Sequence, residues 1–208
     1  MARNGSGRLW LRHIRPDFVI DAVAHLTAED VHRVAPDATA LCFDIDGTVT
    51  DYHAPAVTEA EASHLATLRE AGYQIFVVSN CYGQRAREVH RLFEPYVTGV
   101  FTPEDCVDPA DPKPNPRKHG KPAPDMILAA TARAQIPPDH VVMVGDQLFK
   151  DVLSARRAGV RALLVPRLGP SDHNGVRYLQ RPVERVLRPL LGLPALKRSW
   201  PHTLTPVP

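Results

Sequence analysis

The stretch FDIDGTVTD, residues 43–51, joins a short apolar run to a turn built largely of polar residues. A continuous apolar run of about four to six residues, bounded by turn residues, is typical of a strand buried on both faces of a parallel sheet. Asp44 and Asp46 come at the end of this first predicted strand. The sequence predicts five such strands, at Ala40–Ile45, Gln74–Ser79, Thr98–Thr102, Val141–Val144 and Arg161–Val165.

Helical patterns separate the predicted strands. Thr58–Ala71 begins with a capping box formed by Thr58 and Glu61, and Gly72 stands where a glycine commonly ends a helix. Gly159 closes a later helix in the same way. The alternation of strands and helices predicts an α/β fold, a doubly wound, Rossmann-like parallel sheet with helices on both faces. Further helices are predicted at 83–93, 124–134, 149–158 and 182–191.

Polar residues follow three of the predicted strands. In doubly wound sheets, ligands bind at the carboxyl ends of the strands, so these residues are candidates for a common site. Taken singly, each has an ordinary explanation as a turn, a strand end or a helix cap. Four carboxylates at one edge repel one another unless a cation offsets them, and an all-oxygen ligand set fits Mg²⁺. The candidates are Asp44 and Asp46, then Ser79 and Asn80, then Asp146 and Asp151.

A proline-rich stretch precedes a candidate cation. Residues 103–124 contain seven prolines, so the sequence predicts a long loop there with no regular element. Lys121 lies near the end of this loop, and a lysine acts as a point charge on phosphoryl oxygens. Lys113 and Lys118, in the same loop, are expected to be solvated.

Taken in order, these residues resemble the motifs of the haloacid-dehalogenase-like (HAD) phosphatase superfamily over about residues 40–165. DIDGT at 44–48 resembles its first motif, Ser79 its second, Lys121 its third and GDQLFKD at 145–151 its fourth. The resemblance implies that Asp44 attacks phosphorus to form an aspartyl-phosphate, while Asp46 serves as general acid and base. It also implies Mg²⁺ bound by Asp44, the Asp46 backbone carbonyl and Asp146. Phosphate would then be bound by Ser79, Asn80 and Lys121, with Asp151 in support.

A narrower resemblance concerns the substrate. Only 32 residues separate Asp46 from Ser79, which leaves no room for a large cap domain, so we expect an open site. RPDFV at 15–19, GDQLF at 145–149 and QRPVER at 180–185 resemble capless, IIIA-type bacterial phosphatases related to phosphatidylglycerophosphate phosphatases. This implies conversion of phosphatidylglycerophosphate to phosphatidylglycerol. A soluble sugar-phosphate or nucleotide phosphatase is the alternative, and a non-catalytic nucleic-acid or protein-binding module is the least favoured.

Charge is distributed unevenly along the 208 residues, although the formal net charge is only +2. Residues 1–15 carry four arginines and no acid, and residues 152–208 carry ten Lys/Arg against two acids, so residues 16–151 carry 2 − 4 − 8 = −10. This asymmetry predicts a cation site in the acidic body or an anionic partner for the basic ends, and solvated arginines are an equal alternative.

The helix predicted at 182–191 has an apolar side with arginines nearby. We expect this side to pack on the sheet, with docking on an anionic membrane surface as the less favoured alternative. Its members are Val183, Val186, Leu187 and Leu190.

Other features set the expected location of the chain and its division into parts. Cys42, Cys81 and Cys106 lack metal-ligand spacing, which predicts a reduced, cytoplasmic protein, with peripheral contact at the inner membrane surface left open. No apolar run is long enough to span a bilayer. Of the ten histidines, His53 and His119 lie near motifs and are candidates for substrate contact. Three parts are predicted: an N-terminal extension at 1–39, a phosphatase domain at 40–192 and a Pro-rich tail at 193–208.

Overall fold

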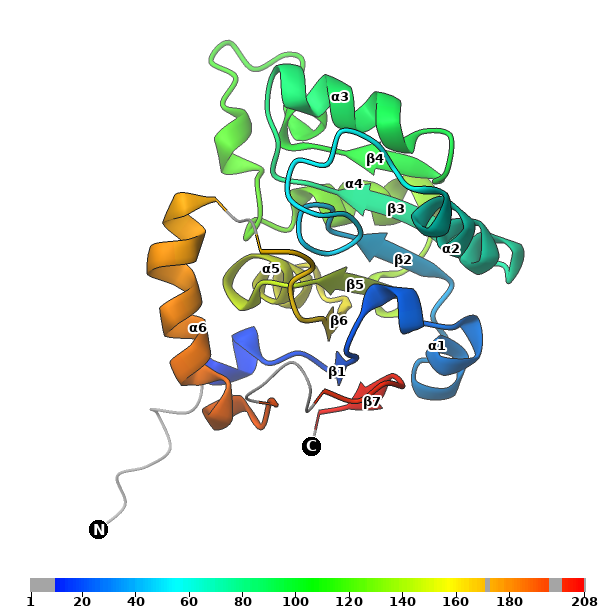
Figure 1. The fold of residues 1–208 in the computed structure, drawn as a ribbon. Helices are drawn as coiled ribbons and strands as arrows, with labels where there is room; N and C mark the ends of the chain where they lie inside the picture. Colours follow the sequence, from blue (N-terminus) through cyan, green and yellow to red (C-terminus); the bar gives the residue numbers. More distant parts are fainter. Residues whose placement is uncertain (1–9, 171–172, 195–199, 208) are drawn as a thin grey trace.

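The computed structural model describes residues 10–170, 173–194 and 200–207. In these ranges a sheet with the strand order β4-β3-β2-β5-β6-β1-β7 forms the centre of the molecule (Figure 1). Neighbouring strands are parallel except for β1 and β7, which are antiparallel. The strands are β1 (Phe18–Val19), β2 (Ala40–Phe43), β3 (Gln74–Val78), β4 (Gly99–Phe101), β5 (Val141–Gly145), β6 (Arg161–Leu164) and β7 (Thr205–Pro206).

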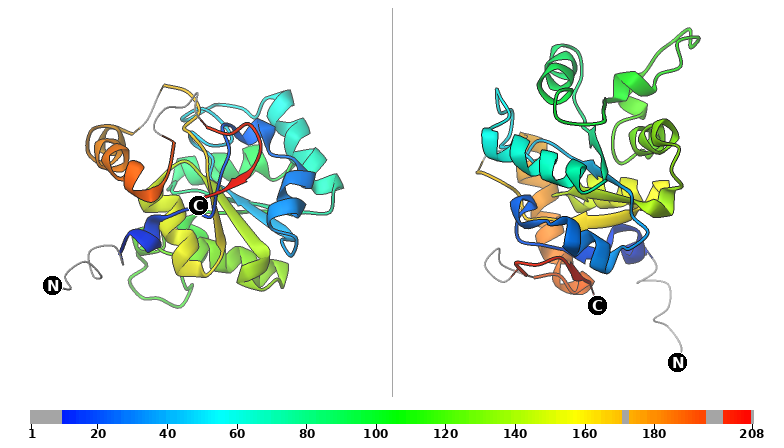
Figure 2. Two further views of the ribbon diagram at one scale, coloured as in Figure 1. Left: turned by 90° about the horizontal axis from the view of Figure 1, so that it is seen from below. Right: turned by 90° about the vertical axis from the view of Figure 1, so that its right-hand side faces the viewer.

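Helices cover both faces of the sheet, as the sequence predicts (Figure 2). Buried residues of α1, α2 and α3 belong to one apolar cluster, and those of α4, α5 and α6 belong to a second cluster on the other face. Along β2, Leu41 and Phe43 enter the first cluster while Ala40 and Cys42 enter the second, because successive side chains of a strand point to opposite faces. The helices are α1 (Ala28–Val34), α2 (Glu59–Glu70), α3 (Gln84–Phe93), α4 (Asp125–Ala134), α5 (Leu153–Ala158) and α6 (Arg181–Leu187).

Strand register brings the predicted site residues to one edge. Phe43, the last residue of β2, pairs with Val77 of β3 on one side and with Val144 of β5 on the other. Because all three strands are parallel, the residues that follow each of them emerge at the same carboxyl edge. The chain therefore carries its three acidic and polar turns to a common place.

Some elements differ from the sequence prediction. Residues 103–124, expected to lack regular structure, contain two single 3-10 turns, Pro103–Cys106 and Pro116–Lys118. Each begins with a proline, whose fixed φ suits the first helical position. Strands β1 and β7, two residues each, were not predicted, and they join residues near both ends of the chain to the sheet. The last helical segment begins earlier than expected, with a wide turn at Val176–Gln180 that continues into α6.

The described part of the chain has neither a large inserted cap between the strands nor a membrane-spanning helix. The connection between β2 and β3 contains only the loop after Asp44 and helix α2. In the same ranges, no helix combines the length and the apolar character needed to cross a membrane.

Candidate active site

Asp44 lies directly after β2 and is buried, with 6% of its surface exposed. Its backbone N–H donates to the Val144 carbonyl at 2.9 Å, which extends the ladder between β2 and β5 by one residue. One carboxylate oxygen, Oδ1, accepts from Lys121 Nζ at 2.5 Å, and Oδ2 accepts from the Thr48 hydroxyl at 3.3 Å. The strand end therefore fixes the direction of this carboxylate.

Lys121 is the buried cation of the site. Its ammonium contacts Asp44 at 2.5 Å and Asp151 Oδ1 at 2.8 Å, and donates to the Val78 carbonyl at 2.9 Å. Burial alone would lower the pKa of this lysine, but Asp151 and Asp44 together raise it above its ordinary value. Lys121 is therefore a fixed positive charge at the strand edge.

Asn80 holds the backbone of Lys121. Its side-chain Oδ1 accepts from the Lys121 N–H at 2.7 Å, and its Nδ2 donates to the Lys121 carbonyl at 2.8 Å. The Asn80 side-chain amide thus forms hydrogen bonds with both the backbone N–H and the backbone carbonyl of Lys121, contacts that the sequence did not predict. Ser79, immediately before it, is buried and lines the same cavity as Asp44 and Lys121.

Asp46 faces a different set of partners from Asp44. Its Oδ1 accepts from the His53 N–H at 2.8 Å and lies 3.3 Å from an Arg85 terminal nitrogen. Gly47, with φ of 88°, lets the chain reverse directly after Asp46, where an L side chain would be strained. The two aspartates of the first motif therefore point into different surroundings, since Asp44 is buried and Asp46 is partly exposed.

Asp146 follows β5 and is completely buried. Its Oδ2 forms an ion pair with Arg181 of α6, and Arg181 also donates to the Asp146 carbonyl at 2.8 Å. The second carboxylate oxygen, Oδ1, is buried without a hydrogen-bond partner among the described residues. Burial raises the pKa of Asp146 to about 8, although the Arg181 guanidinium opposes this shift.

Asp151 approaches the strand end from the wide helical turn Leu148–Val152. Its Oδ2 accepts from the Gln147 N–H at 3.0 Å, while Oδ1 faces Lys121. Gly145 is required by this approach, since a Cβ at that position would clash with the Asp151 side chain. Wide turns of this kind occur frequently at functional sites.

A cavity of about 460 Å³ opens above this strand edge. Of the seven predicted site residues, five bring a charge or a hydroxyl to its wall, namely Asp44, Asp46, Ser79, Lys121 and Asp151. Asn80 also lines the cavity, whereas Asp146 does not. His53 lines the cavity as well, whereas His119 is paired with Asp125 at 2.6 Å. Residues not predicted from sequence complete the wall, namely Tyr52, Cys81, Tyr82, Arg85, Gln147, Lys150, His173 and Val176.

The carboxylates at the strand edge fit a divalent cation. Ligand oxygens of Asp44, Asp146 and Asp151 all lie within 4.8 Å of one another, and all three residues are buried. Three carboxylates against the charges of Lys121 and Arg181 leave a net charge of −3 + 2 = −1 when all are ionised. The unpartnered Asp146 oxygen and this all-oxygen donor set suit Mg²⁺. The Asp46 side chain lies outside this group of three.

Burial also changes the acidity of the nucleophile candidates. It raises the pKa of Asp44 to about 6, while the adjacent Lys121 ammonium acts in the opposite direction. The Cys81 thiol, close to Ser79, has its pKa raised by burial to about 11 and is therefore a poor thiolate source at neutral pH. Asp44 is the stronger candidate for a nucleophile.

Sequence reasoning missed two arginines that contact the motif carboxylates. Arg85 is the second residue of α3, a helix whose position was predicted, and Arg181 lies in a segment that was considered for substrate resemblance, packing on the sheet and membrane contact. Both contacts join residues more than 30 positions apart. Helical periodicity marks a helix face, but it does not reveal which of several arginines reaches a distant strand end.

Comparison with known proteins gives matches along most of the chain. A family model described as HAD-hydrolase-like matches residues 118–188. "Probable phosphatase YqeG" of Bacillus subtilis is 27% identical over 184 residues, which are 88% of this chain and 92% of that protein. A Caldanaerobacter subterraneus protein named as a candidate pyrophosphatase, PpaX, is 36% identical over 49% of this chain and 41% of its own length. A crystal structure of a HAD phosphatase from Thermococcus onnurineus is 28% identical, with a TM-score of 0.43, over 57% of this chain and 50% of that chain.

Proposed function

We propose that this chain, which is a HAD-like phosphatase, hydrolyses phosphate monoesters through an aspartyl-phosphate on Asp44 in a Mg²⁺-dependent reaction. The observation that carries the proposal is the buried Asp44 carboxylate, held 2.5 Å from the Lys121 ammonium in a cavity of about 460 Å³. A carboxylate nucleophile divides a difficult hydrolysis into two easier displacements. A fixed ammonium beside it can receive the phosphoryl oxygens as the nucleophile attacks.

In the first step, an Asp44 oxygen attacks phosphorus, and the bond from phosphorus to the ester oxygen breaks. The leaving alkoxide takes a proton from Asp46, which lines the cavity with Arg85 beside it. In the second step, a water molecule attacks the aspartyl-phosphate and gives its proton to the Asp46 carboxylate. The bond between phosphorus and Asp44 then breaks, inorganic phosphate leaves, and both aspartates return to their starting states.

The other side chains position these groups. Lys121 and Ser79 bind the transferred phosphoryl oxygens, and Asn80 keeps Lys121 in place through its two backbone contacts. Asp44, the Asp46 backbone carbonyl and Asp146 would hold Mg²⁺, and Asp151 belongs to the same carboxylate cluster as Asp44 and Asp146. When bound, the ion supplies positive charge that offsets the repulsion between the carboxylates and a phosphate dianion.

The test is phosphate release from a panel of monoesters by protein free of contaminating phosphatase, with Mg²⁺ and with EDTA. Asp44→Asn is expected to abolish release. Asp139→Asn, an exposed carboxylate remote from the cavity lining, is the matched control and is expected to keep the wild-type rate. An Asp44→Asn protein as active as wild type would overturn the nucleophile assignment, and full activity in EDTA would overturn the metal requirement.

For the substrate, we infer a phospholipid monoester, phosphatidylglycerophosphate, presented at a membrane surface. The support is the surface of the last helical segment, which was expected to pack on the sheet. Leu187 alone of its apolar side is buried, and the other three side chains are exposed. The exposed apolar row, which we call the α6 row, has exposed fractions of 78%, 48%, 71% and 66% for Leu179, Val183, Val186 and Leu190.

The α6 row lies beside the proposed site and beside basic side chains. Val176, at the start of the same helical segment, lines the active-site cavity. A neighbouring hollow of about 470 Å³ is lined by Arg167, Arg177, Arg181, Arg185 and Arg188. An apolar row flanked by arginines suits the interface of an anionic bilayer, where each Lys or Arg contributes about 1 kcal/mol.

Two measurements test this substrate. The panel includes the lipid monoester in vesicles beside soluble sugar phosphates and nucleotides, and we expect the highest kcat/KM for the lipid. Flotation with anionic vesicles is expected to recover wild-type protein at low salt and to lose Val186→Asp and Leu190→Asp. A preference for a soluble ester, or flotation that both variants retain, would overturn the lipid assignment without affecting the phosphatase assignment.

A further inference from the structure

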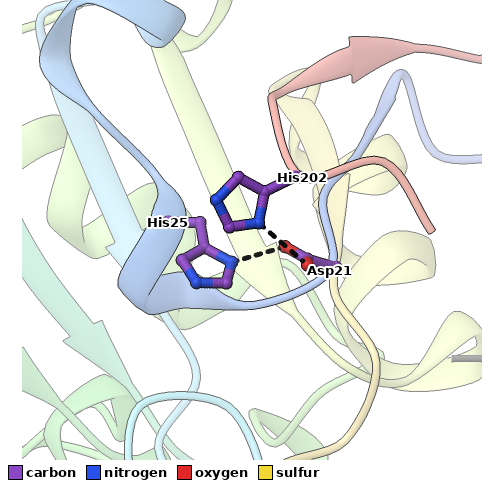
Figure 3. Close-up of side chains that lie close together, drawn as sticks. All are labelled: Asp21, His25 and His202. Carbon is purple, nitrogen blue, oxygen red and sulfur yellow. Dashed lines mark hydrogen bonds and ion pairs between the residues drawn. The ribbon is translucent and has the colours of Figure 1, made fainter. Parts of the chain in front are cut away.

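A second cluster of metal-ligating side chains lies away from the carboxylates of the proposed active site. Asp21, His25 and His202 bring a carboxylate oxygen and two ring nitrogens within 4.8 Å of one another. Figure 3 shows both imidazoles turned toward the same carboxylate, His25 from the segment after β1 and His202 from the segment before β7. His25 Nδ1 lies 2.6 Å from Asp21 Oδ1, and His202 Nδ1 lies 3.3 Å from Asp21 Oδ2.

The backbone already holds these three side chains in place. The Asp21 N–H donates to the Pro201 carbonyl at 2.9 Å, so the residue next to His202 is fixed to Asp21 itself. His25 closes a single 3-10 turn at Val23–His25, which presents its ring four residues after Asp21. The same two segments also pair as strands β1 and β7, and the Val207 N–H donates to the Asp17 carbonyl at 2.8 Å. Two segments from opposite ends of the chain therefore hold the three side chains next to one another.

We propose that Asp21, His25 and His202 bind Zn²⁺, with a fourth position open to water. Imidazole nitrogens select Zn²⁺ over Mg²⁺, which prefers oxygen, and two histidines with one carboxylate are a common zinc ligand set. The ring centroids of His25 and His202 lie 3.8 Å apart, with both imidazoles next to the same Asp21 carboxylate. A bound dication uses both rings in their neutral form and compensates the carboxylate.

A bound ion would join residues 200–207, through His202, to the segment that carries Asp21 and His25. His202 is largely exposed, whereas its neighbours in residues 200–207 are held by the short β7 pairing, by the buried Trp200 and Leu204, and by hydrogen bonds to the carbonyls of Pro201 and Leu204. A metal bound only by the folded chain shifts the equilibrium toward the state in which this segment is docked. The inference is independent of the proposed phosphatase activity, since none of the three ligands lines the proposed active-site cavity.

The test uses the full chain without an affinity tag, titrated with Co²⁺ in excess Mg²⁺ and then with Zn²⁺. Cobalt bound by nitrogen ligands in a four-coordinate site absorbs visible light more strongly than six-coordinate, oxygen-bound cobalt. We expect one equivalent of strongly absorbing Co²⁺, displaced by Zn²⁺. His202→Gln, Asp21→Asn and His25→Gln are each expected to weaken binding at least about tenfold.

His32→Gln, an exposed histidine on α1, is the control and is expected to bind as wild type does. Zn²⁺ is also expected to slow carboxypeptidase trimming of wild type several-fold, but not trimming of His202→Gln. Because His202 is largely exposed, we expect this variant to fold as wild type does. Absence of the strong absorption in wild type would show that the three residues form a hydrogen-bonded cluster only. Equal binding by wild type and all three ligand variants would equally overturn the proposal.

Discussion

Replacing Arg181 with methionine tests whether the buried Asp146 carboxylate, which follows β5, depends on the Arg181 cation for the stability of the fold. Arg181→Met keeps the unbranched apolar stem and removes the guanidinium. The side chain is 18% exposed, whereas its partner Asp146 is fully buried, so water cannot take the place of the lost cation. Arg181 also donates to the Asp146 carbonyl at 2.8 Å and lies 3.3 Å from Glu184 Oε2.

The expected loss depends on pH. In the metal-free protein, burial raises the pKa of Asp146 to about 8. Below that pH the Asp146 carboxyl is protonated with or without Arg181, so the loss comes from the Arg181 contacts with the Asp146 carbonyl and with the buried Glu184 carboxylate, and amounts to at least about 1–2 kcal/mol. Above pH 8 the wild-type carboxylate is ionised and paired, while the variant must retain a proton or bury a bare charge. The loss should then grow by up to about 1.4 kcal/mol per pH unit, toward the 3–5 kcal/mol typical of a broken buried pair.

The assay is urea unfolding of wild type and Arg181→Met in EDTA at pH 6 and pH 9. Arg185→Met, on the same helix but exposed, is the matched control and should change the free energy of unfolding by no more than about 0.5 kcal/mol at either pH. A loss for Arg181→Met that is below 1 kcal/mol at pH 9, or that is equal at both pH values, would refute the reasoning. Asp146 would then not depend on Arg181 for its charge.

Three further predictions follow from the same site. Gly145→Ala should lower the free energy of unfolding by about 1–3 kcal/mol in urea melts, because the new Cβ clashes with Asp151; an unchanged midpoint would mean that Asp151 moves aside freely. Asn80→Ala removes both hydrogen bonds to the Lys121 backbone, so in phosphatase assays kcat should fall about tenfold or more, whereas a change in KM alone would argue against a positioning role. In EDTA, wild-type stability should decline relative to Asp146→Asn as pH rises from about 4 to 8, because a folded-state pKa raised to about 8 favours the protonated, folded form at low pH; parallel pH profiles would contradict it.

The sheet was largely predictable from local sequence. Short apolar runs rich in β-branched residues, such as Val141–Val144, indicate buried strands, and the capping box of α2 predicted a helix start that the structure confirms. Strands β1 and β7 were not predictable, because two residues carry no period. Their pairing depends on residues almost 190 positions apart, for example Phe18 with Pro206.

The site was predictable only in part, for a related reason. Strand order alone brings Asp44 and Asp146 to one edge, so their convergence follows from the fold. The partners of these carboxylates are set by tertiary contacts instead. Asn80, expected to face phosphate, grips the Lys121 backbone, and nothing in its local sequence distinguishes these two roles.

The uneven charge of the chain has an internal explanation as well as an external one. The ten Lys/Arg of residues 152–208 predicted an anionic partner, a cation site in the acidic body or solvated arginines. Arg181 contacts Asp146, Arg156 contacts Asp17 at 2.9 Å, and Arg161 lies 3.8 Å from Asp37. Three of the ten basic residues thus compensate carboxylates of residues 16–151 within the fold. Because one of them compensates a proposed metal ligand, a variant made to weaken membrane binding at Arg181 would also disturb the proposed active site, so membrane contact is better tested at the α6 row.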